Sequence, residues 1–148
     1  RKLLPAERII YIADTAHAPY GDRDRAFVTE RARHLSHTLV EAGAKLVVVA
    51  CNTATSCAIE GLRDQFDVPF VGIEPAIKPA AQMTKSGVIG VLATQRTIHD
   101  PRLSRLIERV AEDVTVLRQA CPGLVECVER GQWQTPRPAA GSPRSRGR

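Results

Sequence analysis

The run Cys51-Asn52-Thr53 places a thiol, an amide and a hydroxyl directly after residues 46–50, the clearest apolar strand pattern in the chain. A helical pattern carries on to residue 66, so we expect the thiol at a helix N-terminus. Free backbone N–H groups and the positive end of the helix dipole there favour a thiolate, a better base and nucleophile than a thiol. Together with the Asn52 amide and the Thr53 hydroxyl, these N–H groups could also bind a carboxylate. The alternative is that Cys51 is a small core residue, since free cysteine is often buried.

A second polar segment, residues 14–22, follows the apolar run 9–13. Within it, Pro19-Tyr20-Gly21 predicts a tight turn in which Tyr20 offers a hydroxyl and Gly21 lets the backbone approach a ligand. A plain structural turn is the other interpretation. Asp14 could orient a proton carrier or an ammonium group, or could cap the next element.

The elements that must position these groups alternate between strand and helix. Apolar runs predict strands at residues 9–13, 46–50, 70–73, 88–93 and 114–117, and helical spacing predicts helices from residue 25 to Gly43, through 58–66, over 76–84 and over 101–110. This order indicates an α/β fold with mostly parallel sheets and flanking helices. Ligands of such folds bind beyond the carboxyl ends of the strands, where residues 14–22, 51–55 and 93–97 all fall.

Composition narrows the class of protein. The 148 residues can bury a core, and a hydrophobic fraction of 43% is ordinary for a globular chain. No apolar run approaches the roughly 20 residues that cross a bilayer. The net charge of +5 is concentrated in residues 133–148, which hold four Arg and no acidic residue. We expect residues 132–148 to form a disordered basic tail rich in Pro and Arg.

The four cysteines are spaced as two C-x5-C pairs, which fit neither a redox CxxC pair nor a zinc ribbon. With no secretory signal visible, we expect reduced thiols and a cytoplasmic location. The four histidines show no metal-ligand spacing, and no Gly-rich phosphate loop is present. We therefore expect no metal site and no bound cofactor.

Four stretches resemble bacterial glutamate racemases: IADTAHAPYGDR (12–23), LVVVACNTATSCAIEGLRDQFDVPFVGIEPAIKPA (46–80), GVIGVLATQRTI (87–98) and ACPGLVECVERG (120–131). The resemblance covers about residues 5 to 131. It implies a two-lobed α/β architecture with the site between the lobes. Residues 1–86 would then form the first lobe, incomplete at its start, and residues 87–131 the beginning of the second.

The resemblance also implies an activity, the cofactor-independent racemisation of L-glutamate to D-glutamate for peptidoglycan synthesis. Two cysteines on opposite faces of the substrate exchange its α-proton, one as thiolate base and one as thiol acid. The implied catalytic residue is Cys51, and the implied substrate-binding residues are Tyr20, Gly21, Asn52, Thr53 and Glu129. The expected partner is a small acidic amino acid, with no membrane and no nucleic acid, and a homodimer is left open.

The chain departs from the family pattern at both ends. It lacks an Asp-Ser-Gly motif near its start and a Gly-Cys-Thr-His motif with the second cysteine, and Cys121 and Cys127 lie in a different stretch. We therefore expect a truncated racemase, inactive or poorly stable and prone to aggregate, because missing strands expose sheet edges. Two alternatives stay open: a racemase for aspartate or another acidic amino acid, and a non-catalytic protein that binds nucleic acid through its arginine tail.

Overall fold

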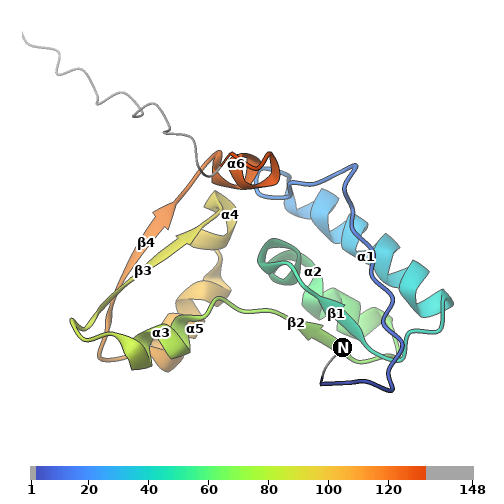
Figure 1. The fold of residues 1–148 in the computed structure, drawn as a ribbon, viewed down its shortest axis with the longest axis horizontal. Helices are drawn as coiled ribbons and strands as arrows, with labels where there is room; N and C mark the ends of the chain where they lie inside the picture. Colours follow the sequence, from blue (N-terminus) through green and yellow to red (C-terminus); the bar gives the residue numbers. More distant parts are fainter. Residues whose placement is uncertain (1–2, 133–148) are drawn as a thin grey trace, which may run out of the picture.

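The computed structural model describes residues 3–132, and helices and strands alternate along them (Figure 1). The helices are α1 (Arg25–Glu41), α2 (Asn52–Gln65), α3 (Ile77–Met83), α4 (Gln95–Ile98), α5 (Pro101–Val110) and α6 (Leu124–Glu129). The strands are β1 (Val47–Val49), β2 (Phe70–Gly72), β3 (Val88–Ala93) and β4 (Thr115–Ala120). The arginine-rich tail predicted from the sequence lies, beyond Gln132, outside the described residues. Between residues 3 and 132, no helix has the length and apolar character that a membrane span requires.

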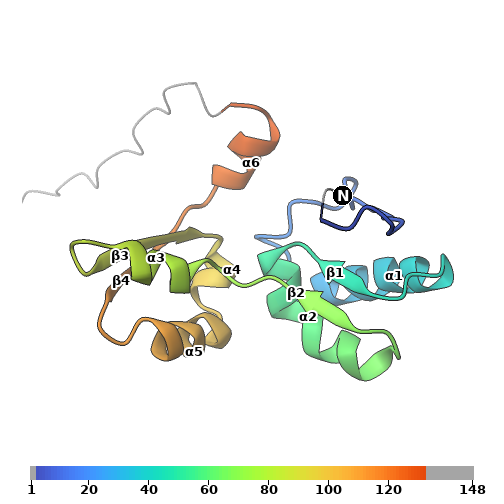
Figure 2. The same ribbon diagram turned by 60° about the horizontal axis from the view of Figure 1, so that its bottom comes forward.

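The strands form two separate parallel sheets, each of two strands. In the first sheet β1 pairs with β2, with Val47 opposite Phe70. In the second sheet β3 pairs with β4, with Val88 opposite Thr115. Helices flank both sheets, and Figure 2 shows the two groups of elements side by side, joined by the segment between β2 and α3. The predicted α/β fold with parallel strands is confirmed.

Each sheet has its own apolar core. The first core packs α1 and α2 against β1 and β2, and Val28 and Leu62 are its most deeply buried side chains. The second core packs α3, α4 and α5 against β3 and includes Ile77, Leu103 and Leu106. Because Ile77 belongs to the second core, α3 packs there, although the sequence places it in a first lobe ending at residue 86.

One face of each sheet is not covered by described residues. Val48 of β1 and Val71 of β2 are 54% and 45% exposed, and Leu92 of β3 and Leu117 of β4 are 67% and 60% exposed. Apolar sheet faces and open strand edges favour association between chains. The predicted tendency to aggregate stays a prediction, and these faces are its structural basis.

Residues 9–13 do not form the strand that their apolar character predicts. The segment pairs with no strand in the described part of the chain, and Ile9 and Tyr11 are 58% and 83% exposed. An apolar run becomes a strand only where a neighbour satisfies its backbone N–H and C=O groups. Within residues 3–132, β1 and β2 pair only with each other, so the prediction is wrong here.

The ends of the helices follow local signals. Asp24 is exposed and caps α1 by accepting the N–H of Phe27 at 2.6 Å. Gly43 stops α1 as predicted: its φ is +83°, and its N–H donates to the carbonyl of Val40 while Ala44 donates to that of Leu39. The sequence pattern does not predict α4, because four residues are too few to show helical periodicity.

Gly72 allows α2 to approach the end of β2 closely. A Cβ on Gly72 would lie 2.4 Å from Cγ2 of Thr55. In this position the Thr55 hydroxyl donates to the carbonyl of Val49 at 3.1 Å and accepts the N–H of Ile73 at 3.2 Å. Thr55 therefore ties the ends of β1 and β2 together, and only a glycine at position 72 leaves room for it.

We expect Gly72→Ala to lower the free energy of unfolding by about 1–3 kcal/mol, because the added methyl group must displace Thr55. Gly90→Ala in β3 is the matched control, since nothing lies within 4 Å of a Cβ there. The control should change stability by less than about 1 kcal/mol. Urea unfolding of both variants checks this, and equal effects of the two would contradict the close approach.

Candidate active site

Cys51 lies between β1 and α2, as the sequence predicts. It is half-buried and is the N-cap of α2, and its Sγ lies 3.5 Å from the backbone N of Ala54, from which it accepts a hydrogen bond. Caps are more often oxygen atoms of Ser, Thr, Asp or Asn. Here a sulfur atom occupies the end of the helix where the dipole is positive.

The two residues after Cys51 lie in different environments. Asn52 is exposed, whereas Thr53 is buried. The hydroxyl oxygens of Thr53 and Thr94 lie 3.5 Å apart, and Thr94 Oγ1 is in turn 3.1 Å from that of Thr97. Residues 51–55 and 93–97 therefore meet at the carboxyl ends of β1 and β3.

The turn Pro19-Tyr20-Gly21 joins the same meeting point. A Cβ on Gly21 would lie 2.9 Å from Cγ2 of Thr94, so the turn packs closely on the segment after β3. Arg96 also donates to the carbonyl of Arg23. The structure thus brings together the three polar segments that the sequence singles out. Thr94 connects them. The sequence signal that could have identified Thr94 as a site residue was its position directly after a predicted strand.

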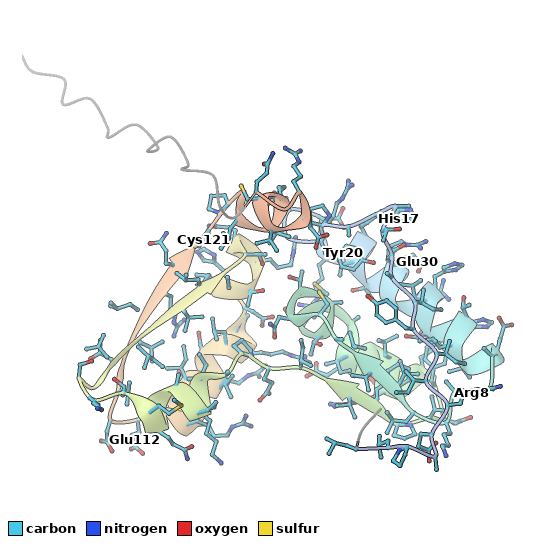
Figure 3. The ribbon with its side chains drawn as sticks, viewed as in Figure 1. Arg8, His17, Tyr20, Glu30, Glu112 and Cys121 are labelled. Carbon is cyan, nitrogen blue, oxygen red and sulfur yellow. The ribbon has the colours of Figure 1, made fainter. Side chains whose placement is uncertain are left out.

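Asp14 is the electrostatic centre of this turn. Its Oδ2 accepts the Tyr20 hydroxyl at 2.5 Å and Arg31 Nε at 2.9 Å, and its Oδ1 accepts His17 Nδ1 at 2.8 Å and Arg31 Nη2 at 2.9 Å. Hydrogen bonding from Arg31 holds the pKa of Asp14 well below its usual range. Burial, together with the bond to Asp14, raises the pKa of Tyr20. Figure 3 shows His17 and Tyr20 near the start of α1.

The other cysteines differ from Cys51. Cys57 is buried in the first core, and burial raises the pKa of its thiol, which keeps it protonated. Cys121 directly follows β4, and its N–H donates to the carbonyl of Ala93, so it lies at the same strand ends as Thr94 (Figure 3). Cys127 is half-buried on α6. All four thiols are free.

Glu129 is not brought to this meeting point by any contact of the described residues. It is exposed at the end of α6, which stands apart from both cores in Figure 2. Its predicted contact with substrate stays a prediction. In residues 3–132, no group of three or more His, Cys, Asp or Glu side chains is arranged to hold a metal ion.

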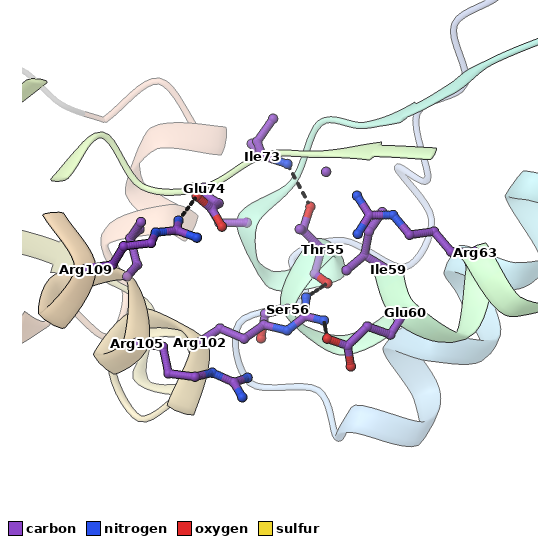
Figure 4. A pocket seen from close by; sticks show the side chains of 13 residues that line it. Thr55, Ser56, Ile59, Glu60, Arg63, Ile73, Glu74, Arg102, Arg105 and Arg109 are labelled. Carbon is purple, nitrogen blue, oxygen red and sulfur yellow. Dashed lines mark hydrogen bonds and ion pairs between the residues drawn. The ribbon is translucent and has the colours of Figure 1, made fainter. Parts of the chain in front are cut away.

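A groove of about 600 Å³ lies between α2, the end of β2 and α5 (Figure 4). It is lined by four arginines: Arg63, Arg102, Arg105 and Arg109. Arg102 pairs with Glu60, and Arg109 with Glu74 at 3.2 Å. Asn52 also lines the groove, but Cys51, Tyr20 and Gly21 do not. Sequence reasoning missed this groove because its walls come from helices far apart in the chain; its cationic lining suits an anionic group.

We expect Asp14→Asn to lower the free energy of unfolding at pH 7 by about 1.5–3 kcal/mol, because Asp14 makes charge-assisted hydrogen bonds. Since its folded-state pKa lies below the unfolded value, this contribution is complete above about pH 4 and is lost as the pH falls further. Unfolding of both proteins across pH 2–7 checks this. The exposed Glu30→Gln serves as control, and a constant difference between Asp14→Asn and the parent at all pH values would contradict it.

Comparison with known proteins identifies the relatives of this chain. A family model described as Asp/Glu/Hydantoin racemase matches residues 1–140. Glutamate racemase of Herpetosiphon aurantiacus is 53% identical over 135 residues, which cover 91% of this chain and 53% of the relative. Glutamate racemase of Ectopseudomonas mendocina is 48% identical over 137 residues, or 92% and 52% of the two chains.

Two solved structures are similar as well. Escherichia coli glutamate racemase in complex with L-glutamate and the activator UDP-MurNAc-Ala has a TM-score of 0.81 and 39% identity, over 88% of this chain and 50% of that one. Glutamate racemase from Thermus thermophilus in complex with β-chloro-D-alanine has a TM-score of 0.71 and 38% identity, over 90% and 49%. The chain spans about half the length of the curated relatives it matches. The chain belongs to the Asp/Glu/Hydantoin racemase family.

Proposed function

We propose that this chain contributes the thiolate-base half of a glutamate racemase. The observation that carries the proposal is the position of Cys51 at the N-terminus of α2, beside the point where Thr53, Thr94 and Gly21 meet. The similarity to curated glutamate racemases supports it. So does the E. coli structure, whose bound ligands include L-glutamate.

The reaction begins at the Cα–H bond of glutamate. The Cys51 thiolate removes the α-proton and becomes a thiol, and the electron pair of that bond stays on Cα and is delocalised into the adjacent carboxylate. Return of a proton from the same side restores the starting enantiomer, and delivery from the opposite side gives its mirror image. No cofactor enters this scheme.

The capping geometry supports a thiolate at Cys51. Its sulfur accepts the N–H of Ala54, and an ionised sulfur accepts such a bond more strongly than a neutral thiol does. The dipole of the 14-residue α2 adds to this preference. Free backbone N–H groups in the first turn, together with Thr53 and Asn52, are then placed to bind a substrate carboxylate. Tyr20, Gly21 and Glu129 complete the proposed substrate contacts.

The second proton carrier of the family's mechanism is not assigned to a described residue. Cys57 is buried in the first core, and Cys127 is on α6. Cys121 lies at the carboxyl ends of β3 and β4, but the residues around it do not match the family's second-cysteine motif. A cytoplasmic location, a role in peptidoglycan synthesis and homodimer formation belong to the same proposal.

We expect the 148-residue chain to exchange the α-proton of one glutamate enantiomer with deuterium from D2O, since a single thiol can remove and return a proton on one face. Cys51→Ala should slow this exchange by about 100-fold or more. Cys57→Ala, which removes a thiol from the core, should retain it. Proton NMR of glutamate measures the loss of the α-proton signal, and undiminished exchange by Cys51→Ala would refute the proposal.

Aspartate is the alternative substrate, and it differs from glutamate by one methylene group. A pocket fitted to glutamate should exchange its α-proton at least about tenfold faster than that of aspartate at equal concentration. The same NMR measurement with both amino acids decides between them. Faster exchange of aspartate would assign the chain to a different branch of the family. The other alternative, nucleic-acid binding by the arginine tail, concerns residues outside the described part of the chain.

A further inference from the structure

Arg31 holds Asp14 with a two-pronged contact. It lies in the second turn of α1, and its Nε and Nη2 donate to the two oxygens of Asp14, at 2.9 Å each. The side chains of Arg31 and Asp14 are only 21% and 10% exposed. Planar guanidinium matches a carboxylate in this way, whereas the ammonium group of lysine cannot.

The Asp14 carboxylate in turn organises the turn that follows it. It accepts hydrogen bonds from the side chains of His17 and Tyr20, and its own backbone carbonyl accepts the N–H groups of His17 and Ala18 at 3.0 Å. Residues 14–20 are therefore folded around one carboxylate. The position of that carboxylate depends on α1 through Arg31.

The hydrogen bond to Asp14 also decides whether the Tyr20 hydroxyl acts as donor or acceptor toward a ligand. An ionised carboxylate only accepts hydrogen bonds, so Tyr20 must donate its single proton to Asp14. The oxygen of Tyr20 then has only lone pairs left for a ligand. Of the charged groups of glutamate, only the α-ammonium group can donate to it.

We propose that Arg31 is a positioning residue of the ligand site: by clamping Asp14, it holds Tyr20 and thereby places Gly21 against Thr94. The proposal rests on the proposed function for the identity of the ligand, but the clamp itself is a property of the fold. Gly21 contacts Thr94, and Thr94 reaches Thr53 in the first turn of α2. Removal of the guanidinium should loosen this side of the site and leave β3 and β4 unaffected.

Arg33 provides a matched control on the same helix. Its Nε and Nη2 donate to the two oxygens of Glu30 at 2.9 and 2.6 Å, in the same two-pronged manner, but this pair is exposed and touches no residue of the site. Arg33→Gln therefore removes an equivalent ion pair and an equal charge. Arg31→Lys keeps the positive charge but removes the guanidinium group that donates to both carboxylate oxygens.

Hydrogen–deuterium exchange of the full chain, followed by mass spectrometry, tests the clamp without any ligand. We expect amides of residues 14–24 to exchange at least about tenfold faster in Arg31→Gln, which corresponds to the loss of one charge-assisted hydrogen-bonded contact. Arg33→Gln and the peptides of β3 and β4 should show no change. Unchanged exchange of residues 14–24 in Arg31→Gln would overturn the proposal.

The pH at which the Tyr20 hydroxyl ionises gives a second readout. A general loss of stability would not change this pH as long as the protein stays folded. In a Tyr11→Phe background Tyr20 is the remaining tyrosine, and absorbance at 295 nm follows it. Loss of the Arg31 charge alone would disfavour the tyrosinate further. If Arg31→Gln instead lets Tyr20 leave Asp14, the hydroxyl ionises at lower pH, toward the ordinary value near 10. A titration that stays at its original pH or moves higher would count against the clamp.

Binding of glutamate, measured by isothermal titration calorimetry, connects the clamp to the site. Arg31→Gln should weaken binding about tenfold. Arg31→Lys should recover part of the loss, and Arg33→Gln should match the parent. Equal affinity of Arg31→Gln and the parent would overturn the positioning role. If the parent itself bound no glutamate, the proposed function would fail, and the exchange and absorbance results would still decide for or against the clamp.

Discussion

The burial of α2 is the constraint on which the rest of the structure depends. Half of its fourteen residues are buried: Thr53, Ala54, Thr55, Cys57, Ala58, Ile59 and Leu62. The helix packs against α1, β1 and β2 in the first core and against α4 beside the second. A helix held on several sides cannot rotate, so its first turn, with Cys51, Asn52 and Thr53, is presented in one direction only. The strict need for glycine at position 72 follows from the same close packing.

Polar contacts of α2 set how the two cores meet. Ser56 donates to Asp100, which also caps α5, and Arg102 of α5 donates to the carbonyl of Thr55 and pairs with Glu60. Such directional bonds favour one relative placement of the two helices, whereas apolar contact alone would tolerate several. The arginine-lined groove and the Thr53–Thr94 contact are both consequences of that placement.

The local elements follow closely from sequence, and the exceptions have a shared cause. The start of α5 at Asp100-Pro101, the end of α1 at Gly43 and the Cys51 junction all depend on residues within one turn of each other, so the pattern is sufficient to predict them. Residues 9–13 fail as a strand because strand formation requires a partner elsewhere in the chain. The Arg31–Asp14 pair joins residues 17 positions apart, and the groove lies between separate elements of the chain. No local pattern connects them.

For the candidate site, the sequence by itself determined the chemistry: a thiol at a strand–helix junction, a turn containing Tyr20 and Gly21, and a polar segment after β3. These are matters of residue type and short-range order. The tertiary structure alone decided which of them meet. Thr94 connects the three segments, the Asp14 carboxylate accepts hydrogen bonds from His17, Tyr20 and Arg31, and Glu129 is exposed. The physical reason is that hydrogen-bond partners and burial are set when separate elements pack together, and only then do distant side chains acquire fixed distances.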